Sequence, residues 1–159
     1  MKKKWLFPVI TFLVLFIIAS VGFPAGGKKM ARGAGDIILS PDELQWKEGP
    51  SALPDAKTAV LEGDPKKRGF FVMRLKLPAG SKIPAHVHKH RERVTVISGK
   101  FNLAMGDKPE NPRVLPAGAY FSLSPNTVHN AWVDEETVVQ ISTAGPWTFK
   151  PVKNEAEKK

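Results

Sequence analysis

The stretch PAHVHKHRERVTVISG, residues 84–99, holds three of the four histidines of this 159-residue chain. His86 and His88 are two residues apart, so on a β-strand their side chains lie on one face with Cα atoms roughly 6.5 Å apart. Two imidazoles at that separation can reach one metal ion, to which each nitrogen binds at about 2.1 Å. The spacing therefore predicts half of a metal site, and the other half has to come from elsewhere in the chain.

Glu92 belongs to the same half only if the chain turns after His88. On a straight strand Glu92 would lie about 20 Å from His86. The polar residues 89–91, KHR, can form that turn, and the β-branched run after them predicts a strand that begins at Glu92. His90 falls inside the turn, and we expect it at the surface or on the rim of the site.

The second half of the site is predicted at His129. This residue opens a predicted strand directly after a turn rich in Ser, Pro and Asn, where a ligand can be held on a rigid element. The chain has no cysteine, which excludes disulfides and thiolate ligands. Any metal would therefore be held by imidazole, carboxylate and water.

The rest of the region is predicted to be all-β. Short runs of β-branched and aromatic residues alternate with Pro and Gly turns, as in a sandwich or barrel. The expected strands lie within residues 36–40, 57–63, 69–78, 92–99, 99–106, 118–124, 128–134 and 136–145. Helical turns are expected only at SPDEL, residues 40–44, and in the polar end, residues 153–159.

These residues resemble the cupins. The first cupin motif is a glycine, five residues, His-x-His, three or four residues, Glu, six residues and a glycine. Its intervals are met by Gly80, His86, His88, Glu92 and Gly99.

In the second cupin motif, Gly118 and His129 are in register, whereas Ser124, Asn126 and Val133 stand at the usual proline, glycine and asparagine positions. Asn tolerates the left-handed backbone that glycine provides, so Asn126 is a mild departure. The resemblance spans about residues 75–141. It implies a double-stranded β-helix, or jelly roll, with His86, His88, Glu92 and His129 as ligands of one divalent ion in the barrel mouth.

Four segments are expected along the chain. Residues 1–22, MKKK followed by an uncharged apolar run, read as an export signal cleaved after Gly22; cleavage after Ala25 and retention as a membrane anchor are the alternatives. Residues 23–36 read as a Gly- and Ala-rich linker, 37–152 as the cupin barrel and 153–159 as a polar tail. The expected location is periplasmic or secreted.

The expected partner is a small molecule. The net charge is +9, but the basic residues are scattered rather than clustered with stacking aromatics, which argues against a nucleic-acid ligand. A membrane would be contacted only through an uncleaved N-terminal segment. The family resemblance favours a homodimer, in which residues 36–40 could pair at an edge.

Three functions remain open from the sequence. Three imidazoles and one carboxylate leave positions free on an octahedral Fe, Mn, Ni or Zn ion, which suits a dioxygenase acting on a small organic molecule. An isomerase or lyase usually needs an added base that the chain does not obviously supply. The alternatives are a non-catalytic binding or sensing cupin of the cell envelope and a metal-stabilised β-domain without a small-molecule partner.

Aromatic and methionine residues are expected around the site. Trp132 and Met105 are the candidates for an apolar pocket above the ion. Residues 144–151 read as a closing segment whose Trp147 and Phe149 pack on the barrel.

Overall fold

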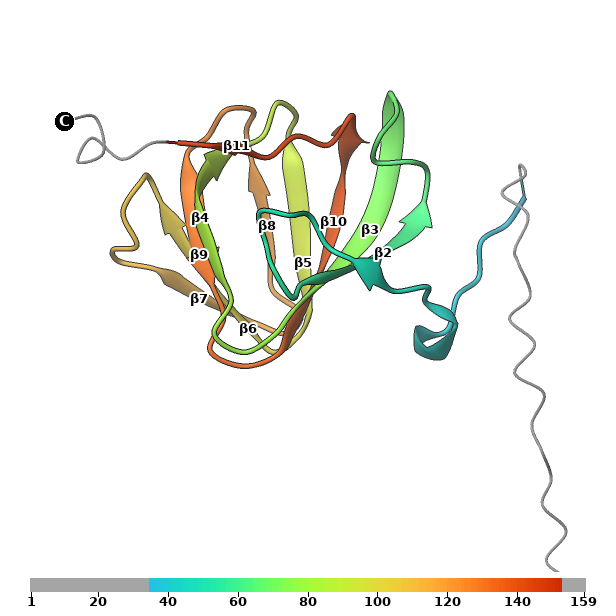
Figure 1. The fold of residues 1–159 in the computed structure, drawn as a ribbon, viewed down its shortest axis with the longest axis horizontal. Helices are drawn as coiled ribbons and strands as arrows, with labels where there is room; N and C mark the ends of the chain where they lie inside the picture. Colours follow the sequence, from blue (N-terminus) through green and yellow to red (C-terminus); the bar gives the residue numbers. More distant parts are fainter. Residues whose placement is uncertain (1–34, 153–159) are drawn as a thin grey trace, which may run out of the picture. The chain divides into compact units, whose positions relative to one another are not determined.

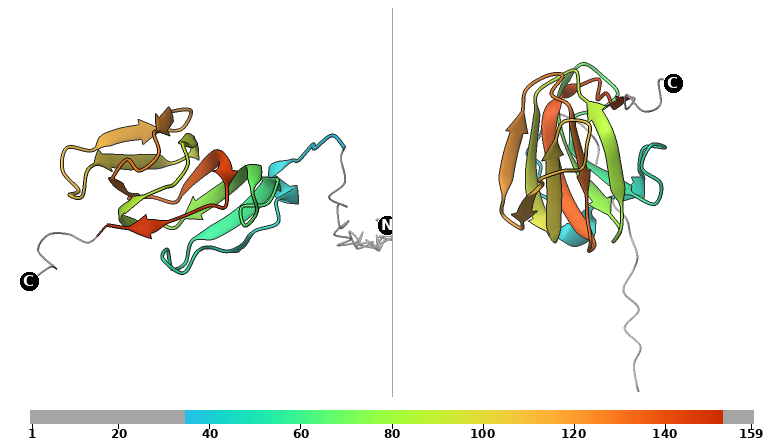
Figure 2. Two further views of the ribbon diagram at one scale, coloured as in Figure 1. Left: turned by 90° about the horizontal axis from the view of Figure 1, so that it is seen from above. Right: turned by 90° about the vertical axis from the view of Figure 1, so that its left-hand side faces the viewer.

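The computed structural model describes residues 35–152, which form two antiparallel sheets (Figures 1 and 2). The first sheet has the order β1 (Lys47–Glu48), β2 (Lys57–Glu62), β3 (Gly69–Leu77), β10 (Thr137–Gly145), β5 (Glu92–Ser98) and β8 (Tyr120–Leu123). The second has the order β11 (Lys150–Pro151), β4 (Lys82–Val87), β9 (His129–Trp132), β6 (Lys100–Met105) and β7 (Arg113–Pro116). The all-β jelly roll expected from the sequence is confirmed.

The core lies between the two sheets and follows the alternation of the strands. On β3, Phe71, Met73, Leu75 and Leu77 are buried, while the residues that alternate with them are partly exposed. Val96 of β5 and Val139 of β10 face the same core. Period-two burial of this kind is what a sheet covered on one face requires.

Several turns have a left-handed backbone, and Gly99 and Asn126 are two that bear on the cupin motifs. Gly99 has φ 74° and sits so close to Thr137 that a Cβ would overlap its side chain, so this motif position takes no other residue without rearrangement. Asn126 has φ 61°, which confirms that asparagine here adopts the conformation for which the second cupin motif uses glycine.

The expected strand at residues 36–40 is wrong. These residues have no regular structure and pair with no strand, and Ile38 is 83% exposed. They lead instead into the 3-10 helix η1 (Pro41–Glu43), where the Glu43 carboxylate accepts a hydrogen bond from the Ser40 backbone N–H at 2.7 Å. This confirms the expected helical turn.

Strand β7 was not expected from the sequence, because prolines surround it. It pairs with β6 at the edge of its sheet, where proline costs fewest ladder hydrogen bonds. The predicted export signal, most of the linker and the polar tail lie outside the described residues. Within residues 35–152, none of the helices has the length and apolar character needed to cross a bilayer.

Candidate metal centre

His86 and His129 face each other from neighbouring strands of the second sheet. His86 lies near the end of β4, His129 is the first residue of β9, and the two are direct cross-strand partners. The pairing register of β4 with β9 shifts between Ile83 and His86. Both side chains are therefore buried, although on a regular strand residues at this odd spacing would face opposite sides. Such β-bulges redirect side chains next to functional sites.

His88 and Glu92 complete the cluster across a short turn. His88 follows the end of β4, residues 89–91 form the connection, and Glu92 begins β5 in the opposite sheet, which confirms the predicted turn and strand start. The Glu92 carboxylate lies 3.4 Å from His88 Nε2 and 3.6 Å from His129 Nε2. The four residues, called here the His–Glu cluster, are each at least 94% buried, with exposures of 4–6%.

Backbone carbonyls orient all three imidazoles in the same way. The Nδ1–H of His86 donates to the Pro84 carbonyl at 2.8 Å, and that of His129 donates to the Thr127 carbonyl at 3.0 Å. His88 Nδ1 makes a short hydrogen bond to the carbonyl of Thr148. A carbonyl can only accept, so each Nδ1 carries a proton, and a ring that is neutral presents its Nε2 lone pair to the others.

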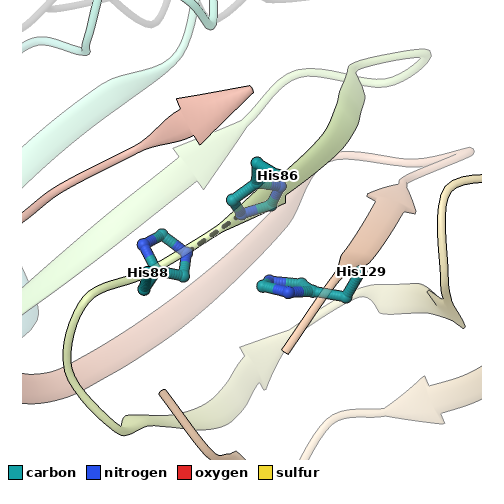
Figure 3. Close-up of side chains that lie close together, drawn as sticks. All are labelled: His86, His88 and His129. Atoms are coloured by element: carbon teal, nitrogen blue, oxygen red, sulfur yellow. Dashed lines mark hydrogen bonds between the residues drawn. The ribbon is translucent and has the colours of Figure 1, made fainter. Parts of the chain in front are cut away.

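Lone pairs therefore converge at the centre of the cluster (Figure 3). His86 Nε2 and His88 Nε2 are 2.9 Å apart, and ligand atoms of all three histidines lie within 4.8 Å of one another. Two acceptors at hydrogen-bond distance need a cation between them, either a proton or a metal ion. Carbonyl-anchored imidazoles of fixed tautomer are also the usual arrangement of metal-binding histidines.

Burial keeps His86 in the form that can bind a metal. Burial, followed by the positive charges that His129 and His88 would carry, lowers the pKa of His86 to about 3. Burial alone would raise the pKa of Glu92, but the hydrogen bond that a protonated His129 donates and the positive charges that the histidines carry when protonated outweigh it and hold that pKa below its ordinary value. At neutral pH the cluster thus pairs a neutral His86 with a carboxylate.

Residues 146–149, called here the covering segment, lie against the cluster. The Phe149 ring stacks on His86 with centroids 4.3 Å apart and planes 20° apart. The Trp147 ring lies nearly parallel to His88, with centroids 5.9 Å apart. Packing of Trp147 and Phe149 on the barrel agrees with the prediction, but the sequence did not reveal their contact with the histidines. The only signal was their two-residue spacing, which also fits simple core.

Backbone hydrogen bonds hold the covering segment in place. The N–H of Trp147 donates to the Pro65 carbonyl at 2.7 Å, and the N–H of Lys89 donates to Thr148 Oγ1 at 2.9 Å. After the segment, β11 pairs with β4, so that Pro151 lies opposite His86 (Figure 1). The segment is therefore a fixed wall of the site.

A cavity of about 30 Å³ adjoins the cluster, which is room for roughly two water molecules. Besides the cluster, its walls are apolar or aromatic and include Phe101, Phe121, Trp147 and Phe149. Neither Met105 nor Trp132 lines it, so their expected pocket role is wrong.

Met105 ends β6 and is 54% exposed, whereas Trp132 is an odd number of residues from His129 along β9 and turns away from the cluster. His90 lies beside the cavity rather than in it, as expected for a residue on the rim.

The chain resembles known proteins over most of its length. The ChrR cupin-like domain matches residues 34–148. No curated protein matches the chain. A solved structure from Methylibium petroleiphilum, described as a candidate acetylacetone dioxygenase, is 25% identical with a TM-score of 0.61, and the match covers 79% of this chain and 87% of that one.

Two further solved structures share the fold at lower identity. An acetylacetone dioxygenase from Acinetobacter johnsonii is 20% identical with a TM-score of 0.58, and the match covers 76% of this chain and 80% of that one. The polyketide cyclase RemF from Streptomyces resistomycificus is 10% identical with a TM-score of 0.62, with coverage of 74% and 86%. At these identities the likeness concerns the fold, because similar barrels carry different chemistries.

Proposed function

This chain belongs to the ChrR cupin-like domain family, and from that premise we propose that it is a metal-binding cupin that oxygenates a small organic molecule. One observation carries the metal part of the proposal: three Nε2 lone pairs and the Glu92 carboxylate converge in a buried, otherwise apolar cavity. We assign His86, His88, Glu92 and His129 as the ligands.

The donor set fits one divalent ion. Imidazole nitrogens suit Fe, Mn, Ni and Zn, and the carboxylate adds the negative charge that offsets part of the ion's charge. When bound, such an ion acts as a Lewis acid or activates a small molecule at a position that the protein leaves open.

The protein contributes orientation and a dry environment. The carbonyls of Pro84, Thr127 and Thr148 hold a proton on each Nδ1 and aim the Nε2 atoms at one point. Apolar walls and the covering segment exclude bulk water, which strengthens every charge interaction within the cavity.

Oxygenation is favoured over isomerisation or lyase chemistry by the composition of the cavity wall. Among residues 35–152, its only titratable side chains are the four members of the His–Glu cluster, so this part of the chain offers no separate base to move a substrate proton. The 25% identical neighbour described as a candidate acetylacetone dioxygenase supports the same interpretation. Acetylacetone and related β-dicarbonyl compounds are therefore the first substrates to test.

The metal assignment is tested by elemental mass spectrometry on protein purified without added metal. We expect about one equivalent of a divalent transition metal in the parent protein and almost none in a His88→Ala/His129→Ala double variant. His90→Ala is the matched control, since His90 lies outside the cavity, and it should keep the metal. Equal metal content in the parent and the double variant, even after reconstitution, would contradict the assignment.

The reaction is tested by following dissolved oxygen with the Fe-loaded protein and acetylacetone. Oxygen consumption that depends on substrate and is lost in the double variant supports the oxygenase. Saturable binding of the compound without its consumption would instead favour the binding or sensing module. Metal without any binding would leave a metal-stabilised β-domain.

We also propose that the protein is exported and forms a homodimer. The basic and apolar residues 1–22 support export, and intact mass of periplasmic protein would test it, with an N-terminus at Phe23 expected. The exposed Ile38, which precedes the edge strand β1 along the chain, supports the dimer. Size-exclusion chromatography with light scattering should show a dimer that Ile38→Lys weakens.

A further inference from the structure

One buried donor in the cavity wall has no partner. Among residues 35–152, Trp147 Nε1 is the single buried side-chain nitrogen or oxygen without a hydrogen bond. Most buried donors are paired, and each exception calls for an explanation such as a bound ligand. The Trp147 ring lines the cavity beside His88 and also a smaller hollow beside His90. The smaller hollow has no room for a water molecule, so the explanation is to be sought in the cavity.

With an ion held by the cluster, the other polar groups of the described wall have no donor left for a ligand. The Nδ1–H groups of the three histidines already donate to backbone carbonyls, and their Nε2 atoms and the Glu92 carboxyl oxygens are assigned to the ion. The remaining wall residues apart from Trp147 are hydrocarbon side chains. The indole N–H is therefore the one donor that the wall can offer to a ligand.

We propose that the Trp147 indole N–H donates a hydrogen bond to an oxygen atom of a small ligand in the cavity, and so selects carboxylate or carbonyl compounds. This inference rests on the proposed function, because the cation held by the His–Glu cluster supplies the opposite charge. A cation on one side and an N–H on another complement a ligand that presents oxygen lone pairs.

The size of the cavity limits the ligand. A space of about 30 Å³ accepts a ligand of very few atoms beside an ion. The hydrogen bond from the backbone N–H of Trp147 to the Pro65 carbonyl holds the wall in place. Formate, the smallest carboxylate, is therefore the probe of choice. A larger dicarbonyl substrate would require the Trp147 and Phe149 side chains to rotate aside.

The test uses the full chain labelled with ¹⁵N-tryptophan, loaded with Zn(II) and titrated with formate. Trp147→Phe keeps an aromatic ring and removes only the donor, and its missing signal assigns the Trp147 indole resonance. We expect that resonance to move downfield with formate while the other tryptophan signals stay in place. Calorimetry should give roughly tenfold weaker formate binding to Trp147→Phe, the usual loss for a hydrogen bond to a charged group.

Controls separate this inference from the metal assignment. Trp132→Phe should bind formate like the parent, since Trp132 does not line the cavity. Zinc content is measured on every sample. Full zinc with an unmoved Trp147 resonance and equal formate affinity in Trp147→Phe would overturn the inference.

Loss of zinc from the parent would contradict the proposed function instead. The same formate titration of the metal-free protein then tests whether the Trp147 indole N–H is a donor to the ligand. A shifted indole resonance would support the donor role without the metal, and an unmoved one would overturn it.

Discussion

The His–Glu cluster and the covering segment touch each other, but the fold positions them by different means. The cluster residues project from or next to strands of both sheets, so strand register fixes where they point. The covering segment has no regular structure and is placed by hydrogen bonds to distant loops, such as that from Trp147 to Pro65. Side chains that strand register positions leave a spacing pattern in the sequence, whereas a wall that loop contacts position leaves no such pattern.

Glu92→Gln should have the largest effect, and it acts on the cluster alone. The amide keeps the shape of the side chain but removes its charge, so zinc affinity should fall more than about 100-fold, since changes outside the ligand shell already cost 10–100-fold. Competition titration with a zinc chelator measures the affinity. Trp147→Phe, in the covering segment, is the matched control and should stay within a few-fold of the parent. A loss below tenfold in Glu92→Gln would remove Glu92 from the ligand set.

Acid should destabilise the metal-free protein through His86. The folded-state pKa of His86, about 3, lies below its unfolded value of about 6.5, so the unfolded state binds more protons as the pH falls. Stability should therefore decrease below pH 6.5, by about 2 kcal/mol at pH 5. Denaturant unfolding at several pH values measures this slope. His86→Asn should flatten it, and an unchanged slope would show that His86 is not its source.

Glu92 acts in the same direction at lower pH. Its depressed pKa means that its contribution is present above its unfolded value and is lost as the pH falls through the folded one. Measurements kept above pH 5 therefore separate the contribution of His86 from that of Glu92.

Gly145→Ala should act on the covering segment and spare the cluster. A Cβ at this position, where β10 ends, would overlap the Lys67 carbonyl oxygen, and overpacking of this kind costs about 1–3 kcal/mol. Denaturant unfolding of the metal-free variant measures the loss, while zinc stoichiometry should remain at one. Loss of zinc along with stability would mean that the two regions are not independently positioned.

The smallest effects are expected in the turn before His129. Asn126→Gly keeps the left-handed conformation, φ 61° in the parent, and should change stability by less than about 0.5 kcal/mol. Asn126→Val, a β-branched residue at positive φ, should cost about 1–2 kcal/mol. Thermal unfolding of both variants compares them. Equal stability would show that the turn tolerates another backbone conformation.

The sequence predicted the fold and the cluster for identifiable reasons. Alternating residues on β3 and β5 reveal a half-buried sheet, and the turn at residues 89–91 follows from the need to bring Glu92 back to His86. The metal itself, its identity and the ligand roles remain predictions.

The features that the sequence did not predict depend on contacts between residues far apart in the chain. Ile38 sits in a β-like run, yet no neighbouring strand pairs with it, and local propensity does not report a missing partner. Met105 lies at a strand end, where correct parity does not guarantee burial. Trp147 and Phe149 reach the histidines only through the path of the chain after β10.

The bulge in β4 makes the cluster depend on chain length as much as on residue type. The shift between Ile83 and His86 is what turns His86 inward, so deletion of one residue there would rotate the imidazole to the outer face. The sheets and their apolar core would keep their contacts. A single in-frame codon deletion would thus convert this barrel into one without the metal site. By this short evolutionary route a family can gain members that keep the fold and lose the metal ligands.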